Sequence, residues 1–221
     1  PHFCMKLPNY STKEERLNYL THAFGVVLSV GALLLLGYSL ARFNDNAVWW
    51  GGIIFGLSAT AALLCSTIYH GLTHTKAKKI FRFIDHAAIY TLIAGSYTPF
   101  ALGNLRNGSG KTVFIVVWIL AGLGILFKWA IRHHLDRFEK LDAILYLIFG
   151  FLAMFYLNEI VTFIPKHGVT LLAIGGLFYV VGVFFYLNKN INYNHAIWHL
   201  FVLGGVGAHY IAVLLYAAPP K

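Results

Sequence analysis

The stretch HAIWHLFVLGGVGAHYIAVLLYA, residues 195–217, decides the class of fold, because it contains no Asp, Glu, Lys or Arg. A helix of about 20 such residues crosses a hydrocarbon core roughly 30 Å thick. Six more apolar stretches of similar length precede it, at about residues 19–41, 47–69, 84–103, 112–131, 141–163 and 169–187. The sequence therefore predicts an all-α integral membrane protein built as a bundle of seven transmembrane helices.

The composition supports the same class and leaves little room for anything else. Of the 221 residues, 58% are apolar and 11% are charged, whereas a soluble domain carries about 25% charged residues. The connections between the stretches are too short for an extramembrane domain of about 50 residues. We expect one membrane domain over residues 1–221, with all chemistry in or at the edge of the bilayer.

Lys and Arg are distributed unevenly between the two ends of the predicted spans. Twelve fall in the N-terminal segment and the second, fourth and sixth connections, against five on the opposite side. The positive-inside rule predicts a cytoplasmic N-terminus and an external C-terminus. The net charge of +9 is then a signal for topology, and no nucleic-acid partner is expected.

Four ionisable residues, far apart in sequence, reach the cytoplasmic edge of the predicted spans. His70 ends the second span, Asp85 opens the third, and His195 and His199 open the seventh. Ionisable groups inside spans are costly and tend to face the bundle interior. Their common depth predicts one site.

The spacing of these residues suits a metal ion. His195 and His199 are four residues apart, about 40° around a helix and about 6 Å along it, so they can share one ion. With His70 they form a three-histidine set with an open fourth position, as in catalytic zinc sites. Ser66 lies four residues before His70, and Asp85 is the nearby carboxylate. His209 lies about 20 Å from His195 along the helix axis, where it can line a cavity but not share the ion.

Simpler interpretations exist for each residue. A His-x-x-x-His pair can join helices through hydrogen bonds, Ser66 can bond to its own backbone, and Asp85 can be a helix N-terminal charge. Cys4 and Cys65 form no disulfide framework or thiolate zinc motif.

The combined motifs resemble the hemolysin III family, the bacterial branch of the progestin and adipoQ receptor superfamily. They are Glu15-x-x-Asn18-x-x-Thr21-His22, Ser66-x-x-x-His70, Asp85-His86, Gly95-Ser96-Tyr97-Thr98-Pro99, and His195-x-x-x-His199 followed by His209. The resemblance covers nearly the whole chain. It implies a seven-helix protein of the bacterial plasma membrane with a zinc ion near the cytoplasmic side.

The resemblance also implies site roles and two kinds of function. The zinc ligands would be His70, His195 and His199, with Asp85 and Ser66 beside the attacking water. Because wider relatives are associated with amide-lipid hydrolysis, a zinc-dependent intramembrane hydrolase of a membrane lipid is the first hypothesis. A pore-forming haemolysin or a sensor of membrane energetics or lipid state, with structural zinc, is the alternative. A third possibility is haem held by histidines, which visible absorbance would reveal.

Overall fold

The structure is a computed structural model that describes residues 7–218 and contains helices but no strand in that range. Cys4, Lys6 and Lys221 lie outside the described residues. The elements are α1 (Thr12–Ala41), α2 (Asn46–Gly71), α3 (Thr75–Leu102), α4 (Gly110–Ala130), α5 (Glu139–Gly150), the 3-10 helix η1 (Phe151–Tyr156), α6 (Leu157–Phe163), α7 (Lys166–Leu187) and α8 (Asn194–Tyr216). The predicted all-α class is confirmed.

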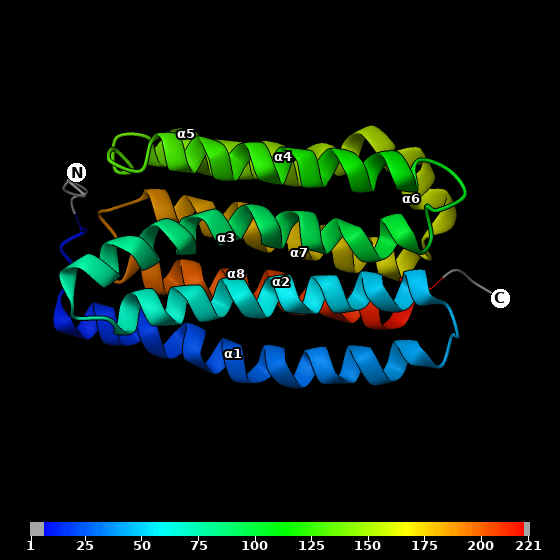
Figure 1. The fold of residues 1–221 in the computed structure, drawn as a ribbon, viewed down its shortest axis with the longest axis horizontal. Coiled ribbons are helices and arrows are strands. Elements are labelled where there is room, and N and C mark those ends of the chain that lie inside the picture. Colours follow the sequence, from blue (N-terminus) through cyan, green and yellow to red (C-terminus); the bar gives the residue numbers. More distant parts are fainter. Residues whose placement is uncertain (1–6, 219–221) are drawn as a thin grey trace.

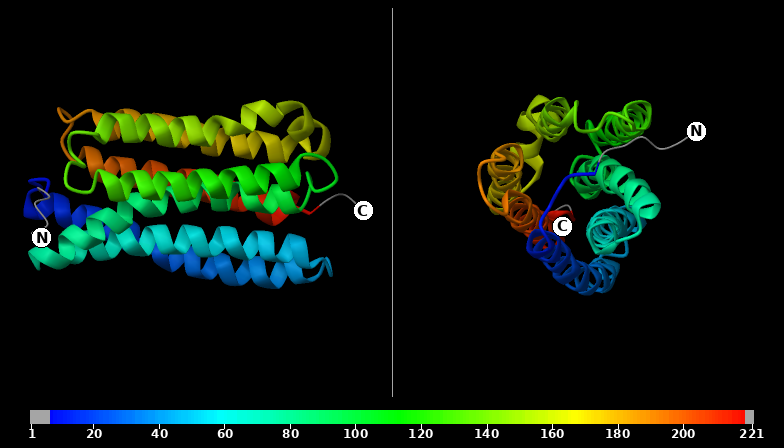
Figure 2. Two further views of the ribbon diagram at one scale, coloured as in Figure 1. Left: turned by 45° about the horizontal axis from the view of Figure 1, so that its top comes forward. Right: turned by 90° about the vertical axis from the view of Figure 1, so that its left-hand side faces the viewer.

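The helices lie side by side along one axis (Figure 1). With α5, η1 and α6 taken as one passage, the described chain runs along the bundle seven times. Viewed along the axis, the chain winds around the bundle until α8 lies beside α1 (Figure 2). As a result, α1, α3, α5 and α8 begin at the same end, where α2, α4 and α7 finish. We call this the site end.

The outer surface of the bundle is apolar. Val27, Leu34 and Phe155 are 70%, 70% and 83% exposed, which suits contact with lipid. Among residues 7–218, six helical passages are long and apolar enough to cross a membrane: α1, α2, α4, the passage from Glu139 to Phe163, α7 and α8. The chain is therefore a multi-pass membrane protein. Helix α3 is not among the six; it is packed between α2 and α4.

Helix α3 begins at Thr75, ahead of the predicted span that starts near residue 84. The basic run from Lys76 to Arg82 is therefore helical rather than a connection. Lys78 explains the tight turn before it, because its Nζ donates to the carbonyls of Tyr69 and Leu72 at 3.1 and 3.0 Å. These are carbonyls that the end of α2 leaves without helical partners.

Lys128 is one of the twelve basic residues counted above with the connections on the cytoplasmic side, but the structure does not place it in a connection. It lies in the last turn of α4, is 1% exposed and pairs with Asp142 of α5, which is 2% exposed. Tyr90 of α3 donates its hydroxyl to Asp142 at 3.1 Å. Because a buried charge needs a partner, this cluster fixes α3, α4 and α5 against one another.

The fifth passage is interrupted by η1, which sequence analysis does not anticipate. The Tyr97 hydroxyl from α3 accepts a hydrogen bond from Ala153 N–H at 2.9 Å and donates to the Gly150 carbonyl at 2.5 Å. A side chain inserted into the backbone ladder is a recognised cause of a helix break. Tyr97 therefore accounts for the change from α-helix to 3-10 helix.

We expect Lys128→Met to lower the free energy of unfolding by about 3–5 kcal/mol, because it leaves the Asp142 carboxylate buried without its cation. The double variant Lys128→Met, Asp142→Leu should recover much of that loss. Unfolding in mixed detergent micelles measures both. The matched control is Lys13→Met, at an exposed position. If Lys128→Met and Lys13→Met lowered the free energy of unfolding equally, the assignment of a buried ion pair between Lys128 and Asp142 would be wrong.

Candidate metal centre

Three histidines from two helices meet at the site end. His70 comes from the last turn of α2, and His195 and His199 come from the start of α8. One ring nitrogen from each lies within 4.8 Å of the others. Their exposed fractions are only 4%, 7% and 1%. The three residues selected from the sequence are thus together and buried, and they could hold a metal ion.

The start of α8 is fixed on the end of α7. The Asn194 side chain donates to the carbonyls of Phe185 and Tyr186 at 3.2 and 3.0 Å. Tyr193, just before the helix, adopts a left-handed backbone with φ of 59°. The two hydrogen bonds and this backbone turn set the position of His195 at the start of α8.

Glu15 of α1 orients His70. Its carboxylate lies 2.6 Å from His70 Nδ1, and the other carboxylate oxygen lies 2.8 Å from Lys78 Nζ. A carboxylate partner places the ring proton on Nδ1 and directs the Nε2 lone pair to the centre, the arrangement found behind histidine ligands of metals. Three helices therefore fix one imidazole.

His199 is oriented by α1 in the same way. Its Nδ1 lies 3.1 Å from the Asn18 carbonyl and 3.0 Å from Thr21 Oγ1. The carbonyl requires a proton on Nδ1, so Nε2 is the nitrogen left to ligate. His22 stacks on His199 with ring centroids 3.5 Å apart and planes 12° apart.

The separation of two of the nitrogens fits a shared metal ion. His70 Nε2 and His195 Nε2 are 3.2 Å apart. Two imidazole nitrogens on one tetrahedral zinc ion, each about 2.0–2.1 Å from it, would be about 3.3 Å apart. His195 Nδ1 is buried with no hydrogen-bond partner among the described residues.

Asp85 and Ser66 lie near the cluster but outside it. The Asp85 carboxylate does not join the ligand group formed by the described residues, yet it borders the same cavity as His195 and His199. Ser66 is 2% exposed. Its Oγ lies next to the Asp85 carboxylate.

An apolar cavity of about 230 Å³ extends from the histidines into the bundle. Its wall is mostly aliphatic and aromatic, from α3 and from the passages of α5 to α8. We call it the apolar cavity. His209 borders it too, with Nε2 3.2 Å from the Leu172 carbonyl.

Tyr10, in the segment before α1, covers the cluster at the site end. Its ring lies 5.4 Å from that of His195 and 6.1 Å from that of His70. Burial, together with the negative charge of Glu139, raises the pKa of the Tyr10 phenol above its usual value. Tyr10 therefore remains a neutral phenol over the cluster.

Sequence reasoning assigned no role to Glu15, Thr21 or Tyr10. Glu15 had a usable signal, because a histidine ligand needs a hydrogen-bond acceptor behind it and the chain has only eight acidic residues. Tyr10 had none, since its position depends on how the segment before α1 folds back.

The fold and the site define a multi-pass helical membrane protein with a buried three-histidine cluster that opens on an internal apolar cavity. The family model described as Haemolysin-III related matches residues 10–210. The chain belongs to the hemolysin III family, as its motifs predict.

Individual relatives agree over nearly their full lengths. Hemolysin-3 homolog of Bacillus subtilis is 42% identical over 94% of this chain and 96% of its own length. Hemolysin-3 of Bacillus cereus is 39% identical over 94% of this chain and 93% of its own length. Monocyte to macrophage differentiation factor of Homo sapiens is 31% identical over 93% of this chain and 86% of its own length.

Proposed function

We propose that this protein is a zinc-dependent hydrolase that cleaves an amide bond of a membrane lipid. The observation that supports it is the three-histidine cluster bordering an apolar cavity inside the bundle. Such a site brings a metal next to a volume suited to an acyl chain.

The donor set fits zinc. It consists of three neutral imidazoles, with the far nitrogens of His70 and His199 held by hydrogen bonds, and it leaves a fourth tetrahedral position for another ligand. Zinc bound there supplies Lewis acidity, which polarises a carbonyl and makes water easier to deprotonate.

Asp85 is the proposed proton acceptor. Water adds its oxygen to the amide carbonyl carbon, and its proton passes to an Asp85 carboxylate oxygen. Asp85 then gives that proton to the leaving nitrogen as the C–N bond breaks, so the products are a carboxylic acid and an amine. Ser66, beside Asp85, donates its hydroxyl hydrogen to the oxyanion that develops on the carbonyl.

The alternative function is a pore or a sensor of membrane state in which the metal is structural. The name of the Bacillus cereus relative, Hemolysin-3, is the observation that favours it. Turnover separates the two functions, because a pore or a sensor consumes no lipid.

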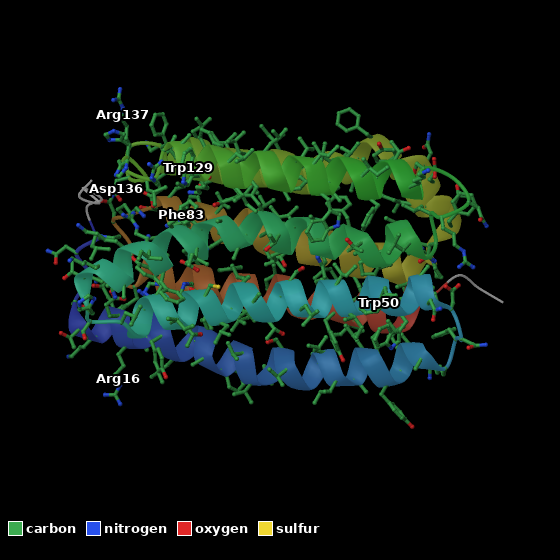
Figure 3. The ribbon with its side chains drawn as sticks, viewed as in Figure 1. Arg16, Trp50, Phe83, Trp129, Asp136 and Arg137 are labelled. Carbon is green, nitrogen blue, oxygen red and sulfur yellow. The ribbon has the colours of Figure 1, made fainter. Side chains whose placement is uncertain are left out.

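We also propose seven transmembrane spans in a bacterial plasma membrane, with the histidine cluster on the cytoplasmic side. Arg16 and Arg137 lie at the site end, whereas Trp50 lies at the other (Figure 3). The excess of basic residues at the site end supports this orientation.

Elemental analysis of protein purified without added metal should give about one zinc ion per chain. His70→Ala, His195→Ala and His199→Ala should each remove most of it, because each deletes a ligand. Glu15→Gln should weaken zinc affinity by about 10- to 100-fold by loosening His70. His209→Ala is the matched control and should retain the metal. Equal loss from His209→Ala would refute the ligand assignment.

Cysteine labelling tests the orientation. In a cysteine-free background, Asn107→Cys should react with a membrane-impermeant thiol reagent in intact cells, because the proposed topology places it outside. Thr73→Cys should react only after permeabilisation. Both positions are exposed in connections at opposite ends of the bundle. The reverse pattern would move the cluster to the outer side.

Asp85→Asn separates chemistry from binding. The change keeps the shape of the side chain and the three histidines but removes the proton acceptor, so lipid-amide hydrolysis should fall by at least about 100-fold. Zinc content should stay near wild type. Asp45→Asn is a matched control at the far end of the bundle, because Asn caps a helix as well as Asp. Equal turnover by Asp85→Asn and wild type would rule out this mechanism.

A further inference from the structure

A second cavity, of about 260 Å³, lies at the site end beneath the segment before α1. We call it the polar vestibule. Its wall differs in character from that of the apolar cavity, and Asp136 marks its position at the end of the bundle (Figure 3). The side chains that give it this character are Asn9, Glu14, Arg82, Asp136, Glu139 and Lys189.

The polar vestibule and the apolar cavity meet at the histidine cluster. Three of the described residues border both, namely His86, Tyr186 and His195. One of the three is a member of the cluster, and Asp85 precedes His86. A molecule that occupies both cavities must therefore place the junction between its polar and apolar parts beside the cluster.

The sizes of the cavities limit the molecule. Cavities that hold a whole drug-sized ligand are about 300–1,000 Å³, and each of these is smaller, at about 230 and 260 Å³. Each can take only one part of an amphiphile. The apolar cavity suits one alkyl chain rather than two, and the polar vestibule suits a small headgroup.

The charges of the polar vestibule limit the headgroup. Arg82 pairs with Asp136 at 2.5 Å, and Lys189 pairs with Glu139 at 2.5 Å. Glu14 adds a carboxylate to the same wall. Among the described residues that line it, carboxylates thus outnumber cations, and both cations are paired, so an anionic headgroup would meet repulsion. A headgroup that offers hydrogen bonds without charge meets no such repulsion.

We propose that the polar vestibule is a headgroup site for a single-chain lipid amide whose headgroup is small, not anionic and hydroxyl-bearing. The alkyl chain lies in the apolar cavity, and the amide lies beside the histidine cluster. The identity of the reacting bond rests on the proposed function, whereas the division of the ligand between two cavities does not.

Binding of three ligands that share one acyl chain tests the headgroup site without relying on turnover. N-dodecanoylethanolamine and N-dodecanoylglycine share one chain and differ in headgroup charge. Calorimetry on the Asp85→Asn protein in nanodiscs should show at least about 10-fold tighter binding of the ethanolamide. N-dodecanoylglucosamine, with a larger headgroup, should bind at least about 10-fold more weakly than the ethanolamide to the same protein. Equal affinities across the three ligands would overturn the proposal.

Two pairs of variants test each cavity separately. Asn9→Trp fills the polar vestibule and should weaken ethanolamide binding by at least about 10-fold, whereas Asn9→Ala at the same position should not. Gly176 borders the apolar cavity, and an added side chain there meets open space. Gly176→Leu should therefore weaken binding by a similar factor. Gly122→Leu, also in open space but on the outer surface, should have no effect.

The outcomes distinguish this proposal from the proposed function. Headgroup discrimination without hydrolysis by the wild type would leave the headgroup site standing and refute the hydrolase. Hydrolysis that depends on Asp85, with no discrimination between headgroups and no effect of Asn9→Trp, would leave the hydrolase standing and refute the headgroup site.

Discussion

The Glu15 carboxylate is the contact on which the arrangement of the site depends. It joins His70 of α2 to Lys78 of α3 while belonging to α1, so three helices meet at one side chain. Without it, His70 would lose the hydrogen bond that selects its tautomer, and Lys78 would lose the charge that offsets its own. Lys78 also donates hydrogen bonds to the carbonyls of Tyr69 and Leu72 at the end of α2. The turn between α2 and α3 therefore depends on the same carboxylate. The geometry of the cluster and the path of the chain at the site end are thus set together.

Polar groups elsewhere in the bundle follow the same constraint, that a buried charge or backbone group needs a partner within an apolar surrounding. Lys128 and Asp142 pair within the protein. Where α4 begins, Ser109 provides no side-chain cap, and its N–H and hydroxyl both donate to Glu159 at 2.9 Å. Tyr97 supplies both bonds for the backbone at the break before η1. Each of these contacts joins two different helical passages. The interaction that gives the buried polar group a partner therefore also fixes the two passages against each other.

The sequence predicts the parts of this structure that depend on local pattern. The length of the apolar stretches predicts the helices, and a spacing of four residues predicts that His195 and His199 share a face of α8. The predicted membrane depth adds His70, and the structure brings a ring nitrogen of all three within 4.8 Å of the others. The interruption at η1 could not be predicted from local sequence, because its cause is Tyr97, which is more than 50 residues away in the chain. The place of Lys128 was missed for a similar reason, since a lysine near a span end is ordinarily a solvated topology signal and only the contact with Asp142 shows otherwise. The roles of Glu15 and Thr21 also depend on which helices become neighbours.

The positions of the acidic residues explain why a cation site is compatible with a chain of net charge +9. Only Asp45 and Glu159 lie at the far end, where they serve the N-termini of α2 and α4. The other six gather at the site end, where four of the helices begin and the positive ends of their dipoles lie. Four of those six, Glu15, Asp136, Glu139 and Asp142, form ion pairs with Lys or Arg. Asp85 forms none with any described residue and borders the apolar cavity, so its carboxylate is not already committed to a cation. A carboxylate placed there can offset part of the charge of a metal ion and still exchange a proton, which is the combination that the proposed hydrolase requires.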